Sequence, residues 1–277
     1  MANQRRNPQA RDRTIGAQLK AVRTQQRRWS LEAAAEAIGW SAATLSRTEN
    51  GKRHITSEDV ATVLAIYGVP TPQREELIAA AREGGTQAGW WSRPLPGVLP
   101  DVGTLASYEA SANAITDWSL ADVPGLLQTE RYAIGIMMDV GVDARDIEMR
   151  WMARCKRQEV LAKIEYTAFI HENVLRRPFG GVAALKEQLA HLEAAPARGL
   201  SVRIVREPAP YLSLRHSWML LHFPEAPPVL HVELFGSSIY LHESEVHGYE
   251  TIRAMLDRSA LSTMESRSMI GRLRERL

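Results

Sequence analysis

Apolar residues recur with a helical period through the first 80 residues of the chain. An alanine-rich pattern between Ser30 and Gly39 predicts one short helix, and Ser41 opens a second one with Leu45 on its inner face. Serine is a good N-cap residue, because its hydroxyl accepts a hydrogen bond from a free N–H of the first helical turn. The same period predicts three further helices, at 14–26, 57–67 and 73–82.

The pattern changes in the second part of the chain, where helices are followed by short apolar runs. Runs rich in Val, Ile, Leu and aromatic residues predict strands at 166–171, 200–206, 218–223, 229–235 and 238–242. Helical patterns fall at 105–118, 129–139, 146–163, 182–194, 246–258 and 262–274. We therefore expect an α+β protein: an all-α N-terminal domain, then an α+β domain with a small mixed sheet covered by helices.

The two short helices around Gly39 have the arrangement of a DNA-binding helix-turn-helix. In this motif the N-terminal end of the second helix enters the major groove. Arg47 is its only outward residue that can make a bidentate contact with guanine, and the small residues before it can contact thymine methyl groups. The residues expected to face double-stranded DNA are Arg28, Ser41, Ala42, Ala43, Thr44, Ser46, Arg47, Lys52 and Arg53.

Charge is distributed unevenly along the chain. Residues 1–53 hold 11 Lys or Arg and four Asp or Glu, a net charge of +7, which leaves −5 for the remainder of a chain whose total is +2. Alone, such a run indicates a solvated surface. Together with a helix-turn-helix pattern it indicates a surface that faces phosphates.

The second helix also carries the residues of a known family. The segment Ser41-Ala-Ala-Thr-Leu-Ser-Arg-Thr-Glu-Asn-Gly51 resembles the S-x-x-x-[IL]-S-x-x-E-x-G signature of Xre-type repressors, relatives of the phage λ and 434 repressors. The resemblance implies a five-helix, λ-repressor-like domain that binds an operator. Many members carry a glutamine at the position of Leu31, so we expect a different affinity or site preference here.

A second resemblance covers the remainder of the chain. Val123-Pro-Gly-Leu-Leu-Gln-Thr-Glu-Arg-Tyr-Ala133 is similar to the V-P-G-L-L-Q-T-x-x-Y-A hallmark of a WhiJ-like, toxin–antitoxin-like C-terminal domain of actinobacterial regulators. Weaker matches include Glu109, Arg154, Arg157-Gln158, Gly180-Gly181, Gln188-Leu189 and Glu265-Ser266. The resemblance implies a cytoplasmic transcriptional regulator, antitoxin-like and autoregulatory, that is encoded beside a small partner protein. It implies no catalytic residues.

These patterns divide the chain into four parts. We expect a disordered basic arm at 1–13, a helix-turn-helix domain at 14–83, a Gly-, Pro- and Trp-containing hinge at 84–100, and a regulatory or partner-binding domain at 101–277. One recognition helix offers few base contacts, so a homodimer on two half-sites is expected. Candidate partner- or ligand-binding residues are Trp90, Trp91, Trp118 and Trp218, for which aromatic core packing is the more common role.

Other functional classes receive less support. No pair of histidines has the H-E-x-x-H spacing, and the chain has no Walker loop, G-x-S-x-G motif or cysteine zinc pattern. We therefore expect no enzyme activity, cofactor or metal, and the single cysteine, Cys155, fits a reducing cytoplasm. No segment has the length of a membrane span or the features of a signal peptide. The main alternative is a small-molecule or protein sensor whose C-terminal domain is the primary functional unit.

Overall fold

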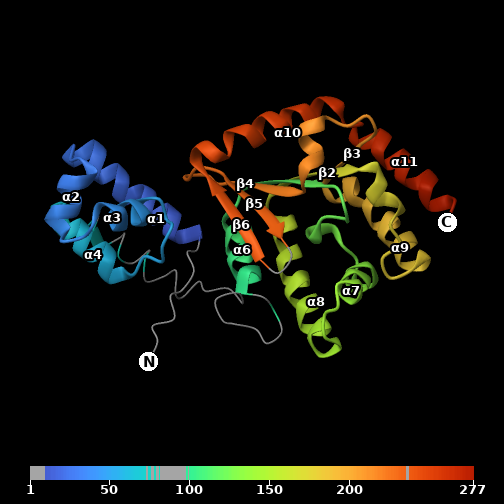
Figure 1. The fold of residues 1–277 in the computed structure, drawn as a ribbon, viewed down its shortest axis with the longest axis horizontal. Helices are drawn as coiled ribbons and strands as arrows, with labels where there is room; N and C mark the ends of the chain where they lie inside the picture. Colours follow the sequence, from blue (N-terminus) through green and yellow to red (C-terminus); the bar gives the residue numbers. More distant parts are fainter. Residues whose placement is uncertain are drawn as a thin grey trace. The chain divides into compact units, whose positions relative to one another are not determined.

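The chain divides into two compact units. The structure is a computed structural model that describes residues 10–72, 74–75, 78, 81, 98, 100–234 and 237–277. One unit comprises Met1–Arg93 with Ala106–Ser111, and the other comprises Pro94–Leu105 with Ala112–Leu277. The first is helical and the second is built on a sheet, which confirms the expected α+β class (Figure 1).

The helical unit begins earlier than the sequence predicts. Its elements are α1 (Ala10–Ala21), a π-helical turn η1 (Val22–Arg27), α2 (Leu31–Ile38), α3 (Ala42–Glu49) and α4 (Ser57–Ile66). Residues 10–13 were expected in a disordered arm, but they form the first turn of α1. Asp12 accounts for this difference, because its buried carboxylate accepts a hydrogen bond from the Ile55 N–H at 3.0 Å and so fixes that turn. The arm 1–9 and most of the helix expected at 73–82 lie outside the described residues.

The turn between α2 and α3 follows the prediction closely. Ser30 accepts a hydrogen bond from the Ala33 N–H, and Gly39 ends α2 in the left-handed region with φ of 77°. Glycine adopts this conformation without the steric cost that a Cβ brings. The inner faces of α1 to α4 form one apolar core, to which Leu19, Leu45 and Leu64 contribute fully buried side chains.

The second unit contains a six-stranded mixed sheet. Its strands are β1 (Ala114–Ser119), β2 (Glu165–His171), β3 (Ser201–Val205), β4 (Trp218–His222), β5 (Val229–Leu234) and β6 (Ser237–His242), in the order β3-β2-β1-β4-β5-β6. Neighbouring strands among β1, β2 and β3 run parallel, and the pairs β1–β4, β4–β5 and β5–β6 are antiparallel. The helices of this unit are α7 (Glu130–Asp139), α8 (Ala144–Gln158), α9 (Val182–Glu193), α10 (His247–Ser259) and α11 (Thr263–Glu275), and the helix α6 (Pro100–Ser111) is divided between the two units after Leu105.

The helix expected at 105–118 is wrong in its second half, where the chain forms the central strand β1. All but the first residue of β1 are buried, because neighbouring strands flank it and both of its faces are covered. A short run that is buried on both faces lacks the alternation that marks a half-exposed strand, so periodicity does not separate it from a helix. The five strands and the other helices of this region begin and end within a few residues of the predicted positions.

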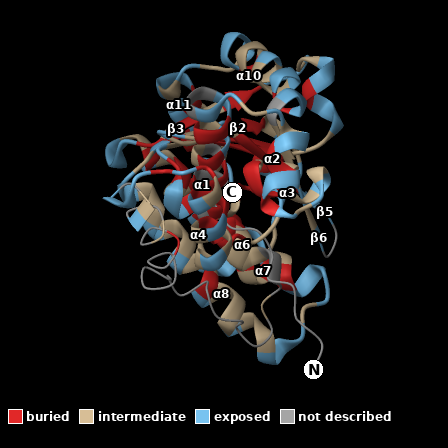
Figure 2. Ribbon diagram, turned by 90° about the vertical axis from the view of Figure 1, so that its left-hand side faces the viewer, coloured by how far each residue is buried: buried red, intermediate tan, exposed pale blue. Residues whose placement is uncertain are grey.

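The two faces of the sheet differ in character. Trp118, Phe169, Trp218, Leu220 and Leu230 lie on one face and form an apolar core with Leu256 of α10. Side chains alternate between the faces of a strand, so Asp117 and Ser119 lie on the other face of β1. Figure 2 shows β2 largely buried and the outer surface of α10 exposed.

Candidate functional site

The helix α3 presents the side chains that the sequence assigns to DNA. Ser41 caps it: the hydroxyl accepts a hydrogen bond from the Thr44 N–H at 3.1 Å and lies 2.9 Å from the Thr44 hydroxyl. Buried Leu45 and Thr48 fix the inner face of the helix. On the remaining surface Ala43 and Arg47 are exposed, whereas Ala42, Thr44 and Ser46 are half-buried.

The basic residues near α3 differ in what they contact. Within the described part of the chain, the side chains of the exposed residues Arg28, Arg47 and Lys52 make no hydrogen bond or ion pair. Arg53 is engaged internally: its Nε donates to the Thr48 hydroxyl at 2.7 Å, and its guanidinium lies 2.8 Å from Asp59. Arg53 therefore positions the loop after α3, and its contact with DNA stays a prediction, like those of the other three cations.

A buried ion pair fixes the C-terminal end of α3. Glu49 receives two hydrogen bonds from Arg23 of η1, each 2.7 Å long, and Arg23 also donates to the Trp29 carbonyl at 2.8 Å. The hydrogen bond to Glu49 raises the pKa of Arg23. Glu49 is the glutamate of the signature around α3, and this contact gives it a structural role that the sequence pattern did not reveal.

Two of the four candidate tryptophans lie among the described residues. Trp90 and Trp91 lie outside the described residues. Trp118 and Trp218 are buried in the core beneath α10, and Trp118 donates a hydrogen bond from Nε1 to the Ser213 carbonyl at 2.6 Å. Both therefore pack in the core, and both also line the cavity described below, so their part in ligand binding stays a prediction.

The hallmark segment 123–133 forms a braced loop after β1. Three glutamine side chains bind its backbone. The Nε2 of Gln128 donates to the Val123 carbonyl at 2.6 Å, and the Nε2 of Gln158 donates to the Gly125 and Gln128 carbonyls at 3.1 and 2.9 Å. Gln188 donates to the Leu127 carbonyl at 2.8 Å and accepts from the Thr129 N–H at 2.7 Å.

The braced loop explains several of the scattered family matches. Arg154 donates from its guanidinium to Oε1 of Gln128, so Arg154, Gln158 and Gln188 all serve to hold this loop. Thr129 stands at the N-cap of α7, but its hydroxyl makes no capping hydrogen bond.

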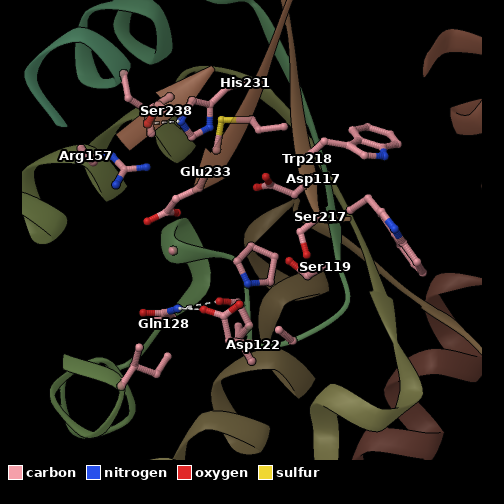
Figure 3. Close-up of a pocket in the computed structure, with 18 of the residues that line it drawn as sticks. Asp117, Ser119, Asp122, Gln128, Arg157, Ser217, Trp218, His231, Glu233 and Ser238 are labelled. Carbon is pink, nitrogen blue, oxygen red and sulfur yellow. Dashed lines mark hydrogen bonds between the residues drawn. The ribbon is translucent and has the colours of Figure 1, made fainter. Parts of the chain in front are cut away.

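The loop borders a cavity of about 430 Å³ on the polar face of the sheet (Figure 3). The cavity is lined by Asp117 and Ser119 of β1, Asp122 of the loop, and His231 and Glu233 of β5, with Arg154 and Arg157 from α8. None of these residues was selected as a site residue from the sequence. Asp117 accepts a hydrogen bond from the Tyr166 hydroxyl at 2.5 Å, and His231 lies 3.1 Å from the Ser238 hydroxyl.

The environment of the cavity shifts three ionisation equilibria. Burial, with repulsion from Glu233, raises the pKa of Asp122 to about 6. Burial, with repulsion from Arg157, lowers the pKa of Arg154 to about 10 and that of His231 to about 3. At neutral pH Asp122 is therefore charged at an energetic cost, and His231 is neutral.

In the described ranges, no group of three His, Cys, Asp or Glu side chains could hold a metal ion. Among the helices described, none has both the length and the apolar character that a membrane crossing needs.

Two family comparisons match this chain. Residues 14–77 match a helix-turn-helix domain, and residues 102–272, more than half of the chain, match a domain of unknown function (DUF5753). No curated protein and no solved structure matches the chain. The helix-turn-helix match points to DNA-binding regulation by the N-terminal unit.

Proposed function

We propose that this chain, which belongs to the DUF5753 family and carries an N-terminal helix-turn-helix domain, is a sequence-specific transcriptional regulator that reads its operator with α3. One observation carries the proposal: the exposed side of α3 ends in Arg47, whose guanidinium has no partner among the described residues. An arginine that emerges from the groove-facing side of such a helix can bind guanine O6 and N7 together.

The surrounding charges support binding to the DNA backbone. Arg28 and Lys52 are exposed without side-chain partners in the described part of the chain, and residues 1–53 carry a net charge of +7. Such residues bind phosphates and supply affinity that does not depend on sequence. Ala42, Ala43, Thr44, Ser46 and Arg47 then supply the discrimination between bases.

Finer aspects of this function rest on the sequence resemblance. We infer an Xre-type repressor fold, a homodimer on two half-sites, and control by a small partner protein encoded nearby in an antitoxin-like, autoregulatory system. The need for a second half-site supports the homodimer, because a single recognition helix buries too little surface for tight specific binding.

A gel shift on the region upstream of the protein's own gene tests the proposal. The whole chain is titrated against this duplex and against a scrambled duplex of the same length and composition, across a series of salt concentrations. We expect the upstream duplex to bind about a thousandfold more tightly or better, since specific and non-specific affinities differ by at least that factor. Equal affinity for both duplexes at every salt concentration would contradict sequence-specific binding.

A further inference from the structure

The cavity on the polar face of the sheet is not explained by DNA binding. It lies wholly within the unit built on the sheet, and its floor is formed by central strands. Asp117, Ser119 and His231 are each at most 6% exposed, on strands where apolar side chains are the rule. Their polar groups face a space that other side chains do not fill (Figure 3).

Two polar groups that line this cavity lack a partner among the described residues: the hydroxyl of Ser119 and the buried Nε of Arg154. Ser119 is 6% exposed and lines the cavity, and its hydroxyl has no hydrogen-bond partner among the residues that the structure describes. Its neighbour Ser217 accepts a hydrogen bond from the Leu120 N–H at 3.0 Å and keeps its own hydroxyl hydrogen for donation. Polar groups at such a site are normally paired, so Ser119 and Arg154 point to a ligand with hydroxyl groups, which can donate to or accept from Ser119 and accept from the Arg154 Nε.

The charges around the cavity favour a cation. Asp117, Asp122 and Glu233 reach it from β1, the hallmark loop and β5, and in Figure 3 they face its centre from different sides. The opposing charges of the lining are two arginines of α8, of which Arg154 already donates to Gln128, and Arg177 lies near Asp122 outside the lining. His231 is neutral at physiological pH, so the lining carries a net charge of −1.

We propose that this cavity binds a small organic cation, a protonated amine that also carries hydroxyl groups. The ammonium group lies between Asp122 and Glu233, where it offsets the repulsion of the two carboxylates. The ligand hydroxyls bind Ser119, Ser217 and Asp117. At about 30 Å³ per water molecule the cavity has room for roughly 14 waters, so a ligand of about a dozen non-hydrogen atoms fits.

The same arrangement makes binding depend on pH. Asp122 faces Glu233 of β5 and the guanidiniums of Arg154 and Arg177, and its pKa in the free protein is about 6. Asp117, Arg157 and His231 also line the space. Below pH 6 Asp122 becomes neutral and loses its attraction for the ammonium group. Affinity for the amine therefore falls as the pH drops through about 6.

Three sugars of nearly equal size test the charge of the ligand. Glucosamine, glucose and glucuronate differ chiefly in carrying a positive, a zero and a negative charge at pH 7.0, where the amine of glucosamine is mostly protonated, and each is titrated into the whole chain by calorimetry at that pH. We expect glucosamine to bind about tenfold or more tightly than glucose, since a hydrogen bond to a charged group contributes that much. The proposal would be overturned if glucose bound as tightly as glucosamine, if glucuronate bound most tightly of the three, or if glucosamine did not bind.

Variants of the lining test the location of the site. Asp122→Asn and Glu233→Gln keep the side-chain shapes and should each weaken glucosamine binding about tenfold, while Glu225→Gln, an exposed carboxylate outside the cavity, should leave it unchanged. Urea unfolding verifies that each variant is folded. Because this site lies within one unit, its test does not depend on whether the protein binds DNA. Unchanged glucosamine affinity in both cavity variants would place the binding elsewhere.

Discussion

Arg47 is the residue on which sequence discrimination is expected to depend. Replacing it with alanine removes the only long donor on the outward side of α3, so the preference for the operator over other DNA should fall by about 1–3 kcal/mol. Binding to random duplex should change much less. Fluorescence anisotropy at one salt concentration measures the affinity for the operator and for random duplex, and the ratio of the two gives the discrimination.

Lys52→Ala is the matched control for Arg47, because both cations are exposed and without side-chain partners in the described chain. A phosphate contact contributes equally to the affinity for every DNA sequence. This variant should therefore weaken binding to both duplexes by the same factor, and it should reduce the slope of log affinity against log salt concentration by about 1. If Arg47→Ala behaved in the same way as Lys52→Ala, Arg47 would be a phosphate contact and not a reader of bases.

Asp122 lines the cavity, and its charged carboxylate is expected to lower the free energy of unfolding at neutral pH. Its pKa of about 6 in the folded chain lies above the ordinary value of 3.8, so the folded state binds the proton more tightly than the unfolded state does. Stability is therefore greatest below about pH 4 and is lost as the pH rises to about 6, by up to about 3 kcal/mol.

Asp122→Asn should remove this loss. The free energy of unfolding at pH 7 should rise by up to about 3 kcal/mol, whereas at pH 4 it should hardly change. The amide oxygen can still accept the 3.3 Å hydrogen bond that Gln128 donates to the carboxylate. Urea unfolding at the two pH values measures the difference. A gain of the same size at both would show that charge is not its cause.

At the scale of elements, the close approach of α1 to α3 positions the second helix of the helix-turn-helix. A Cβ added at Gly16 would lie 2.4 Å from the Thr48 carbonyl oxygen and 2.7 Å from that of Glu49. Both neighbours are backbone atoms, so the helices must separate. Gly16→Ala should cost about 1–3 kcal/mol of stability and weaken DNA binding.

Gly248→Ala serves as the control for this helix contact. Gly248 is an exposed glycine of α10 with no atom within 4 Å of the added Cβ, so alanine there should stabilise by about 0.5–1 kcal/mol through helix propensity alone. Thermal unfolding of the two variants separates the effects. A Gly16→Ala protein as stable as the unaltered chain would mean that α1 and α3 can move apart freely.

The two helices of the helix-turn-helix could be predicted from the sequence because their signals are local. Ser30, Gly39 and Ser41 cap the two helices through contacts with residues at most four positions away along the chain. The cavity could not be predicted in the same way. Its lining comes from β1, which resembled a helix, and from β5, more than 100 residues later. Only the pairing of β1 with β4, and of β4 with β5, brings Asp117 and Glu233 to one face.

The contacts of the Gln158 and Gln188 side chains with the loop 123–133 could not be predicted from the sequence either, because they join distant elements. The hallmark around Gln128 can be recognised in the sequence. The role of its glutamine follows only from the structure, because the backbone N–H and C=O groups of the loop have no partner in a helix or sheet and must be paired by side chains. Gln188 satisfies two of them from α9, about 60 residues away. Spacing along the chain did not reveal which polar side chains would meet the loop.

At the scale of the whole molecule, the proposed homodimer sets a geometric requirement on the operator. A dimer that places one α3 in each half-site needs both grooves on the same side of the duplex, about 34–36 Å apart. Inserting about five base pairs between the half-sites turns one groove to the opposite side. Binding should then fall to the level of a single half-site, and an insertion of about ten base pairs should restore part of it.

This insertion series distinguishes a dimer from a monomer by how the affinity depends on the helical phase between the two half-sites. A monomer contacts one half-site, so its affinity should not change with the spacing at any length. A dimer gives an affinity that oscillates with the helical repeat, because each half-turn of added DNA moves the second groove out of reach of its α3. Gel shifts on duplexes lengthened one base pair at a time measure the period. An affinity that does not change with spacing would mean that a single α3 accounts for operator binding.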